Sequence, residues 1–467
     1  MINRNIASII KMLDSENIDS KYSNEMIHGV SIDTRTLVSG NLYVPIVGKT
    51  FDGHKFINKA IEAGAVACLW DKNHKVPDVD FPFIIVEDTT LALQALAHAY
   101  RLQLSCKVVG ITGSNGKTST KDILAAMLSK HYITQKTLGN FNNEIGAPLT
   151  LLSLSEECQV AVIEMGMEQF FELQTLSKMA EPDIAIITNV GDAHKENLGS
   201  IENIALAKLE ILEGLIKGGL LIYDGDQPLL SDAMNQVDID LSMQLIGFGK
   251  NSEVDDYWLS YVNQDDTGLS FAFNNREDKI RLNMFGYHNA LNALAAWICA
   301  HALGCSDEEI KEGLKNIEVT GLRNELVEIK HCRILNDSYK SNPQSLHAAL
   351  DTFEQFKSPY KIVVVGDMLD LGSDTDLIHY RSGKDMGHYQ IDEVLTIGDL
   401  ARYIAQGARD ALPLAHIEHF ETRDNLLNYL KPFLDHDCMI LVKGSRAMKL
   451  DVLVSELENI DEGVTYE

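Results

Sequence analysis

The chain has 467 residues, of which 45% are hydrophobic and 23% are charged, a composition typical of soluble globular proteins. Its length predicts roughly three domains. Its 40 lysines and arginines stand against 68 aspartates and glutamates, which gives a formal net charge of -28. This charge argues against a nucleic-acid binder with a basic surface, so a phosphate site would have to be a local positive pocket.

Cysteine usage and hydropathy indicate the compartment. The seven cysteines are odd in number and form no CxxC pair, which argues against a disulfide framework or a metal knuckle. Residues 1–16 soon become charged, so they predict an amphipathic helix and not a signal peptide. No run reaches the roughly 18 apolar residues of a membrane span. We expect a cytoplasmic monomer that neither enters a membrane nor binds nucleic acid.

Residues 1–104 predict a small mixed α/β domain. Four short apolar runs read as strands, and the stretches 54–64 and 90–104 read as helices; the strands are expected at 29–33, 42–46, 65–70 and 83–88. The segments 33–35 and 52–54 are interpreted as surface turns.

Residues 105–318 predict a central domain in which strands and helices alternate, as in a mostly parallel sheet. The stretch 107–122, KVVGITGSNGKTSTKD, runs from an apolar strand through a glycine-rich turn into a helix. This is the plan of a phosphate-binding P-loop, in which backbone N–H groups and Lys117 contact phosphate and the Thr118 hydroxyl can ligate Mg²⁺. The strict P-loop pattern would place a glycine at Ile111. Antiparallel hairpins are expected over 250–285 and a capped helix over 286–304.

Residues 319–467 predict a third, Rossmann-like α/β domain. Its strands are expected at 333–336, 361–367, 393–399 and 439–445, and its helices near 344–356, 399–410, 422–430 and 447–458.

Polar residues follow two apolar runs of the central domain. Glu164 ends one run, and His194 follows another. Ligands of open α/β sheets bind beyond the carboxyl ends of the strands, so these side chains fit a Mg²⁺–nucleotide site. Lys208 lies in a helical stretch on the same face as apolar residues, and periodicity alone favours a lysine that snorkels to the surface.

Six segments, in this order and at matching spacing, resemble the ATP-dependent Mur ligases of bacterial cell-wall synthesis. They are GITGSNGKTSTKD, TLGNFNNEIG, VIEMGM, ITNVGDAH, GYHNALNA and NDSYKSNP. The resemblance implies a three-domain ligase that uses ATP and two Mg²⁺ ions. The end segments SIDTRTLVSGNLYVPIVGKTFDGHKF, VVVGDMLDLG and LVKGSRAMKL imply UDP-N-acetylmuramoyl-tripeptide and D-alanyl-D-alanine as substrates. L-lysine and meso-diaminopimelate both stay open as the third residue of the tripeptide.

The resemblance also implies a role for each matched residue. The catalytic set is Lys117, Glu164, His194, Lys208 and Arg323. The implied metal ligands are Thr118, Glu164, His194 and a Lys208 carbamylated by CO₂. The nucleotide would contact Gly113, Ser114, Asn115, Gly116, Lys117, Thr118, Ser119, Asn289, Asn292, Arg323 and Asp337. The substrates would contact Thr34, Arg35, Asn140, Asn143, Lys443, Ser445 and Arg446.

Three positions depart from the family pattern. Asn336 replaces an acid, Lys340 replaces an asparagine, and Phe171 replaces a glycine at a helix start. Two other functions are compatible with parts of the sequence. A folylpolyglutamate-type ligase shares the central ATP module, and a nucleotide-dependent switch would use only the P-loop.

Overall fold

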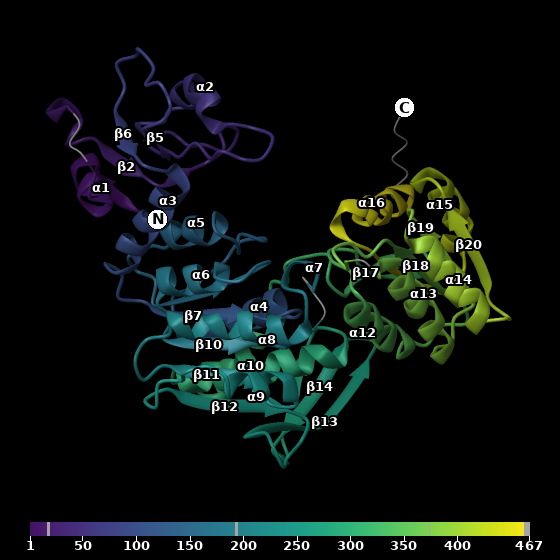
Figure 1. Ribbon diagram of the computed structural model, residues 1–467. Coiled ribbons are helices and arrows are strands. Elements are labelled where there is room, and N and C mark those ends of the chain that lie inside the picture. Colours follow the sequence, from purple (N-terminus) through teal and green to yellow (C-terminus); the bar gives the residue numbers. More distant parts are fainter. Residues whose placement is uncertain (16–18, 192–194, 373, 462–467) are drawn as a thin grey trace.

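The computed structural model describes residues 1–15, 19–191, 195–372 and 374–461. It has the three-domain α/β architecture that the sequence predicts (Figure 1). The N-terminal domain, drawn in purple and blue, and the C-terminal domain, drawn in green and yellow, lie on different sides of the central domain. No helix in the described part of the chain combines the length and the apolar composition that crossing a membrane requires.

The N-terminal domain contains a parallel sheet in the order β3-β4-β5-β6 and an antiparallel pair, β1-β2. The strands are β1 (Asn3–Asn5), β2 (Met26–His28), β3 (Val30–Ser31), β4 (Leu42–Tyr43), β5 (Ala67–Asp71) and β6 (Phe83–Val86). The helices are α1 (Ile6–Leu13), α2 (Ile57–Glu62) and α3 (Thr89–Arg101), with 3-10 turns at Ser20–Tyr22 and Gly53–Phe56. As predicted, α1 is amphipathic, because Ile6, Ile9 and Ile10 are buried on one face.

The central domain is built on a sheet in the order β15-β14-β13-β12-β11-β10-β7-β9-β8, parallel from β8 to β13 and antiparallel at β14 and β15. Its strands are β7 (Lys107–Thr112), β8 (Thr134–Lys136), β9 (Val160–Glu164), β10 (Ile184–Ile187), β11 (Leu220–Asp224), β12 (Gln244–Gly249), β13 (Tyr257–Asp265), β14 (Gly268–Phe273) and β15 (Ile280–Leu282). Its helices are α4 (Lys117–Leu128), α5 (Gly146–Ser153), α6 (Glu172–Ala180), α7 (Lys195–Leu198), α8 (Ile201–Leu209), α9 (Pro228–Met234), α10 (Tyr287–Ala302) and α11 (Asp307–Leu314), with a 3-10 turn at Glu210–Glu213.

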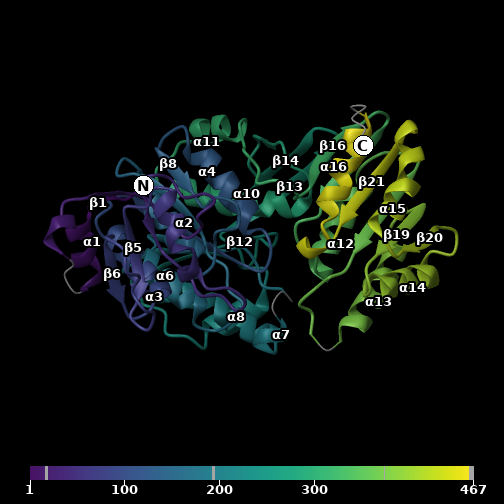
Figure 2. The ribbon, with the colours of Figure 1, turned by 90° about the horizontal axis from the view of Figure 1, so that it is seen from above.

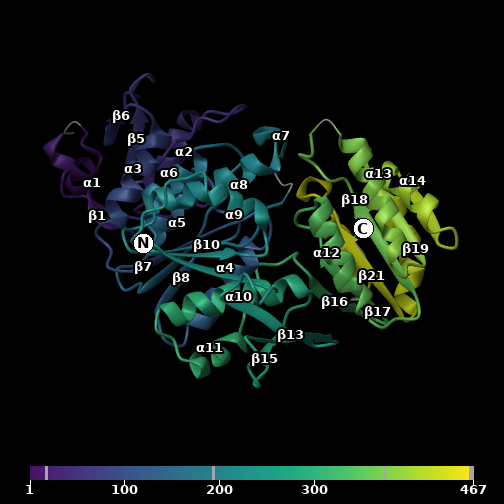
Figure 3. The same ribbon diagram turned by 60° about the horizontal axis from the view of Figure 1, so that its bottom comes forward.

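The C-terminal domain has a sheet in the order β16-β17-β21-β18-β19-β20, in which β16 is antiparallel to β17 and the other described strands run parallel to their neighbours. Its strands are β16 (Glu325–Ile329), β17 (Cys332–Asp337), β18 (Lys361–Gly366), β19 (Glu393–Ile397), β20 (His416–Phe420) and β21 (Cys438–Lys443). Its helices are α12 (Pro343–Glu354), α13 (Thr375–Asp385), α14 (Ala401–Ala411), α15 (Arg423–Leu430) and α16 (Leu450–Asp461), with 3-10 turns at Met386–His388, Lys431–Asp435 and Arg446–Met448. Figures 2 and 3 show α12 on the side of this domain that faces the central domain.

The two domain junctions differ in their packing. One continuous hydrophobic core joins the N-terminal and central domains: Leu93 and Leu96 of α3 belong to the same buried cluster as Leu151 of α5 and Leu173 of α6. The C-terminal domain has its own two cores, and among the described residues of the central domain only Phe285 belongs to them. A junction with so little shared core permits movement of the C-terminal domain as a unit.

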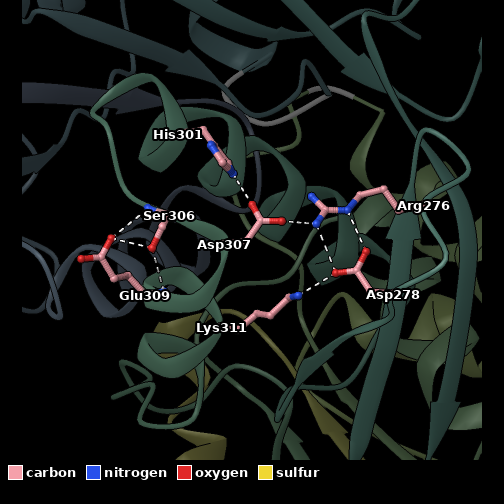
Figure 4. A network of polar contacts seen from close by, with 7 residues as sticks. All are labelled: Arg276, Asp278, His301, Ser306, Asp307, Glu309 and Lys311. Carbon is pink, nitrogen blue, oxygen red and sulfur yellow. Dashed lines mark hydrogen bonds and ion pairs between the residues drawn. The ribbon is translucent and has the colours of Figure 1, made fainter.

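A polar network fastens the turn after β14 to the start of α11 (Figure 4). Arg276 pairs with Asp278 at 2.9 Å and also with Asp307, and Lys311 pairs with Asp278 at 2.6 Å. His301 at the end of α10 lies 2.5 Å from Asp307. The network ties the antiparallel edge of the sheet to the helices that cover it.

Phe171 has a backbone conformation that favours glycine. It is the N-cap of α6 with φ 71°, in the left-handed region, and its N–H donates to the carboxylate of Glu210 at 2.8 Å. The helix start is retained, with a bulky side chain in a conformation that L-residues rarely adopt.

Candidate active site

The P-loop lies between β7 and α4, at the carboxyl end of the central strands. Gly113 and Gly116 have φ values of 150° and 81°, and a Cβ at Gly116 would lie 2.5 Å from Asn292 Oδ1. The loop is fixed by the neighbouring strand end, because Asn115 N donates to Asn189 Oδ1 at 2.9 Å and Thr188 Oγ1 donates to Asn115 O at 2.6 Å. Only glycine fits these two positions without rearrangement.

Lys117 folds back over the loop that precedes it. Its Nζ donates to the carbonyl of Gly113 at 2.7 Å. Burial, together with repulsion from Lys340, lowers the pKa of Lys117 to about 8. A group of negative charge would relieve both effects, which is the environment expected at an anion site.

Glu164 forms the next wall of the site, at the end of β9 beside β7. Its Oε2 accepts a hydrogen bond from Thr118 Oγ1 at 2.8 Å, and its Oε1 accepts one from Asn142 Nδ2 at 2.7 Å. The carboxylate is 1% exposed. Thr118 and Glu164 together offer the oxygen ligands that Mg²⁺ prefers. A third predicted metal ligand, His194, lies outside the described residues.

Lys208 is buried in α8 and is 2% exposed, so the prediction of a snorkelling lysine is wrong. Among the residues that the structure describes, no carboxylate pairs with it. Its pKa lies well below the ordinary lysine value because of burial and of repulsion from Lys117 and Lys340. An uncompensated amine in this position costs free energy unless it is neutral or chemically changed.

Arg323 reaches the site from the connection between the central and C-terminal domains. Its guanidinium stacks on the ring of Tyr339, with Cζ 3.9 Å from the ring centroid. Its buried Nη1 has no hydrogen-bond partner in the described part of the chain. A buried guanidinium nitrogen without an acceptor is suited to an anionic ligand.

Asp337 and Lys443 form the wall on the C-terminal domain. Lys443 Nζ donates to Asp337 Oδ2 at 2.6 Å and to the carbonyl of Lys340 at 2.9 Å. The residues pair in register across β17 and β21. Asn336, which replaces an acid, is buried and accepts from Ser338 Oγ at 2.7 Å.

These walls enclose a cavity of about 980 Å³ between the central and C-terminal domains. The sequence-predicted residues that line it are Ser114, Asn115, Gly116, Lys117, Thr118, Ser119, Asn140, Asn143, Glu164, Asn292, Arg323, Asp337 and Lys443. Lys340 also lines it, so this departure adds a positive charge to the cavity wall.

Several other predicted residues lie away from the cavity wall. Gly113, Lys208 and Asn289 do not line it, and Asn289 donates to the carbonyl of Phe285 at 2.7 Å. Ser445 Oγ accepts from Leu369 N at 3.0 Å, and Arg446 pairs with Asp451 at 2.6 Å.

The N-terminal candidates form a separate group in their own domain. Arg35, next to Thr34, is 86% exposed and holds Asp33 in a bidentate ion pair, which lowers the pKa of that carboxyl to about 2. The prediction of a surface turn at 52–54 is wrong for His54, which is 4% exposed and stacks on His74.

The sequence alone did not identify Asn142 and Gln344 as site residues. Asn142 lies in the same loop as Asn140 and Asn143, and only the fold shows that it is the one that contacts Glu164. Gln344 Oε1 of the C-terminal domain accepts from Asn115 Nδ2 of the central domain at 2.9 Å. No local sequence pattern predicts this contact.

The chain matches three family models: "Mur ligase family, catalytic domain" over residues 26–101, "Mur ligase middle domain" over 111–300, and "Mur ligase, glutamate ligase domain" over 322–446. It is 40% identical over 459 residues to the UDP-N-acetylmuramoyl-tripeptide--D-alanyl-D-alanine ligase of Bacillus subtilis (strain 168), with 98% of this chain and 99% of the relative covered. The chain belongs to the Mur ligase family.

Solved structures of Mur ligases share the architecture of the whole chain. A crystal structure of MurF from Acinetobacter baumannii superposes with a TM-score of 0.87 at 27% identity and covers 98% of this chain and 99% of its own. The MurF ligase of Thermotoga maritima in complex with ADP has a TM-score of 0.81 at 25% identity and covers 93% of this chain and 98% of its own. The order of the family motifs therefore identified the family and the three-domain fold correctly.

Proposed function

We propose that this Mur ligase joins D-alanyl-D-alanine to UDP-N-acetylmuramoyl-tripeptide at the expense of ATP, in peptidoglycan precursor synthesis. The full-length similarity to the Bacillus subtilis enzyme supports this substrate pair. The observation that carries the proposal is the cavity that the P-loop lines together with Arg323 of the interdomain connection. A P-loop opposite an arginine is an arrangement for transfer of a phosphoryl group, because both stabilise its negative charge.

ATP would bind along the P-loop, with its phosphates on residues 114–118 and its adenine near Asn292, which lies against Gly116. Asp337 would face the ribose. Mg²⁺ would be held by Thr118 and Glu164, and when bound it would neutralise phosphate charge. The residues fit these ligands, since Lys117 and Arg323 provide positive charge that the described protein groups leave largely uncompensated.

The reaction has two steps. The terminal carboxylate of the tripeptide attacks the γ-phosphorus of ATP, which forms an acyl phosphate and releases ADP. The amine of D-alanyl-D-alanine then attacks the acyl carbon, loses a proton, and expels phosphate as the amide bond forms. Lys117 and Arg323 reduce the repulsion between the carboxylate and the triphosphate in the first step. Closure of the C-terminal domain would keep water from the acyl phosphate.

Lys208 would react with CO₂ to form a carbamate. Its lowered pKa favours the neutral amine, which is the nucleophilic form. The carbamate would carry a negative charge near Lys117 and Lys340, which turns two repulsions into attractions and adds a possible oxygen ligand for a second Mg²⁺.

The remaining substrate contacts follow from position. The uridine diphosphate end would bind near Thr34 and Arg35, with Asn140 and Asn143 on the path to the P-loop. Lys443 lines the cavity on the side where the dipeptide would enter, and Ser445 and Arg446 would approach after closure.

Phosphate release measured with purified protein tests the function. We expect release to require ATP, Mg²⁺, a UDP-N-acetylmuramoyl-tripeptide and D-alanyl-D-alanine together, with lysine-containing and diaminopimelate-containing tripeptides compared side by side. Release that is independent of the dipeptide would refute the proposal. Stimulation by a folate would favour the folylpolyglutamate-type alternative, and nucleotide binding without turnover would favour the switch.

A further inference from the structure

Two charged neighbours on α4, Lys121 and Asp122, are almost completely buried, with exposed fractions of 0% and 1%. Neither lines the cavity. Burying charged groups costs free energy unless their partners are well placed, so the contacts of this pair indicate its role.

Asp122 holds the connection between the central and C-terminal domains. Its Oδ2 accepts a hydrogen bond from the backbone N–H of Thr320 at 2.7 Å. Its Oδ1 accepts one from Lys136 Nζ at 2.7 Å, and the same ammonium donates to the carbonyl of Glu318 at 3.1 Å. Both backbone groups belong to residues 315–324, which run from the end of α11 to the start of β16. The P-loop helix is therefore fastened to this connection at two points.

Lys121 extends the contact toward the metal-binding candidates. Its Nζ lies 3.5 Å from Thr320 Oγ1, 3.5 Å from Asp122 Oδ1 and 3.8 Å from Glu164 Oε2. One ammonium group thus lies between the connection and the carboxylate that accepts from Thr118.

The connection carries Arg323 only three residues beyond the fastened Thr320. Leu322 and Asn324, on either side of Arg323, have φ values of 69° and 48°, in the left-handed region. Arg323 lines the same cavity as Lys117, Thr118 and Ser119, the first residues of α4. Fastening at Thr320 leaves 321–324 as the short stretch about which the C-terminal domain can turn.

We propose that Asp122, flanked by Lys121 and Lys136, is a positioning residue that fixes Arg323 relative to the P-loop. The carboxylate anchors the connection on α4, so that the C-terminal domain turns beyond Thr320 and Arg323 stays near the phosphates. This role rests on the proposed function, in which Arg323 contacts the γ-phosphate.

The test compares Asp122→Asn with wild type, with Lys136→Met as a second variant and Lys315→Met as the matched control. Lys315 lies in the same connection, but its side chain is 67% exposed and pairs with Glu312. Because misplacing a catalytic group by about 1 Å can cost on the order of 10²-fold in rate, we expect D122N to lower kcat by at least about tenfold. ADP affinity should stay within about threefold, since the P-loop itself is intact. K315M should match wild type.

A double-mutant cycle with Arg323→Ala separates positioning from general destabilisation. If Asp122 acts through Arg323, D122N should add less than about threefold to the kcat loss of R323A, whereas independent effects would multiply. Should D122N fail to fold, the same cycle can be measured with K136M, because the Lys136 side chain is 21% exposed. Multiplying effects, or a variant with wild-type kcat, would overturn the proposal. An inactive wild-type protein would instead count against the proposed function.

Discussion

The hydroxyl group of Thr118 donates a 2.8 Å hydrogen bond to Oε2 of Glu164. The two residues come from the first turn of α4 and the end of β9, which lies beside β7 in the sheet. Asn142 holds the other carboxylate oxygen at 2.7 Å, so the group is oriented before any ligand arrives. Preorganisation of this kind allows a metal ion to bind without rearranging its ligands.

Glu164→Ala should therefore lower kcat on the order of 10²–10³-fold, because the variant loses the proposed ligand for the ion that would neutralise phosphate charge. The loss should be accompanied by a higher Mg²⁺ requirement, measured by titrating Mg²⁺ in the phosphate-release assay. Glu213→Ala, at a surface glutamate that pairs with Lys178, is the matched control. Full activity of E164A at the ordinary Mg²⁺ concentration would contradict this assignment.

Lys208→Ala should abolish turnover, and a short carboxylic acid should restore part of it. The acid can occupy the space of the missing side chain and supply the negative charge that a carbamate would carry near Lys117 and Lys340. Lys178→Ala, at an exposed lysine, should be active with or without the acid. Wild-type-like activity of K208A in the absence of any acid would rule out the carbamate role.

Phe171→Gly should stabilise the protein by about 1 kcal/mol. A side chain in the left-handed region costs roughly 1–2 kcal/mol, and removing this cost is partly offset because glycine loses more conformational entropy on folding. Phe171 is 69% exposed, so little packing is lost. Chemical denaturation measures the change. Phe171→Ala keeps the strained backbone and removes the ring, so its stability should stay near that of wild type. A destabilised glycine variant would show that the ring contributes more than the backbone strain costs.

The network in Figure 4 predicts a loss of stability at acid pH. Hydrogen bonding to Arg276, and then to Lys311, lowers the pKa of Asp278 to about 2, below the value of about 3.9 for an unfolded aspartate. A lowered folded-state pKa gives stability that is present above about pH 4 and lost as the pH falls toward 2. Because the Asp278 side chain is 43% exposed, the contribution should be only about 0.2–1 kcal/mol.

The free energy of unfolding of wild type and Asp278→Asn, measured between pH 6 and pH 2, checks this. The difference between the two proteins should be largest near neutral pH, shrink below pH 4, and decrease with added salt. A difference that grows as the pH falls would contradict the sign of the effect.

Local sequence patterns were sufficient to predict those site residues whose role depends on their immediate neighbours in the chain. The P-loop was predicted because an apolar strand, small residues and a helix start adjoin in one stretch, and Glu164 because it directly ends a strand. Helix α13 was missed because its buried residues are His379, Ser382 and Gly383, so it has no apolar stripe. It packs through glycines: a Cβ at Gly383 or Gly407 would collide with the backbone of the facing helix.

Burial of charged residues could not be deduced from the sequence. The periodicity around Lys208 favours a lysine that reaches the surface, and only the packing of α8 in the folded domain buries it. In the same way, Asp122 meets Thr320 across 198 positions of the chain, a contact set by the fold and not by any spacing.

The most direct test of the proposed ligase reaction follows the oxygen atoms of the tripeptide's terminal carboxylate. A UDP-N-acetylmuramoyl-tripeptide labelled with ¹⁸O in its terminal carboxylate is incubated with the protein, ATP, Mg²⁺ and D-alanyl-D-alanine, and the phosphate is analysed by mass spectrometry. An acyl phosphate passes one carboxylate oxygen to the phosphate, so each turnover should give one labelled phosphate together with the extended peptide. Unlabelled phosphate, or labelled phosphate without the extended peptide, would contradict the proposed ligase reaction.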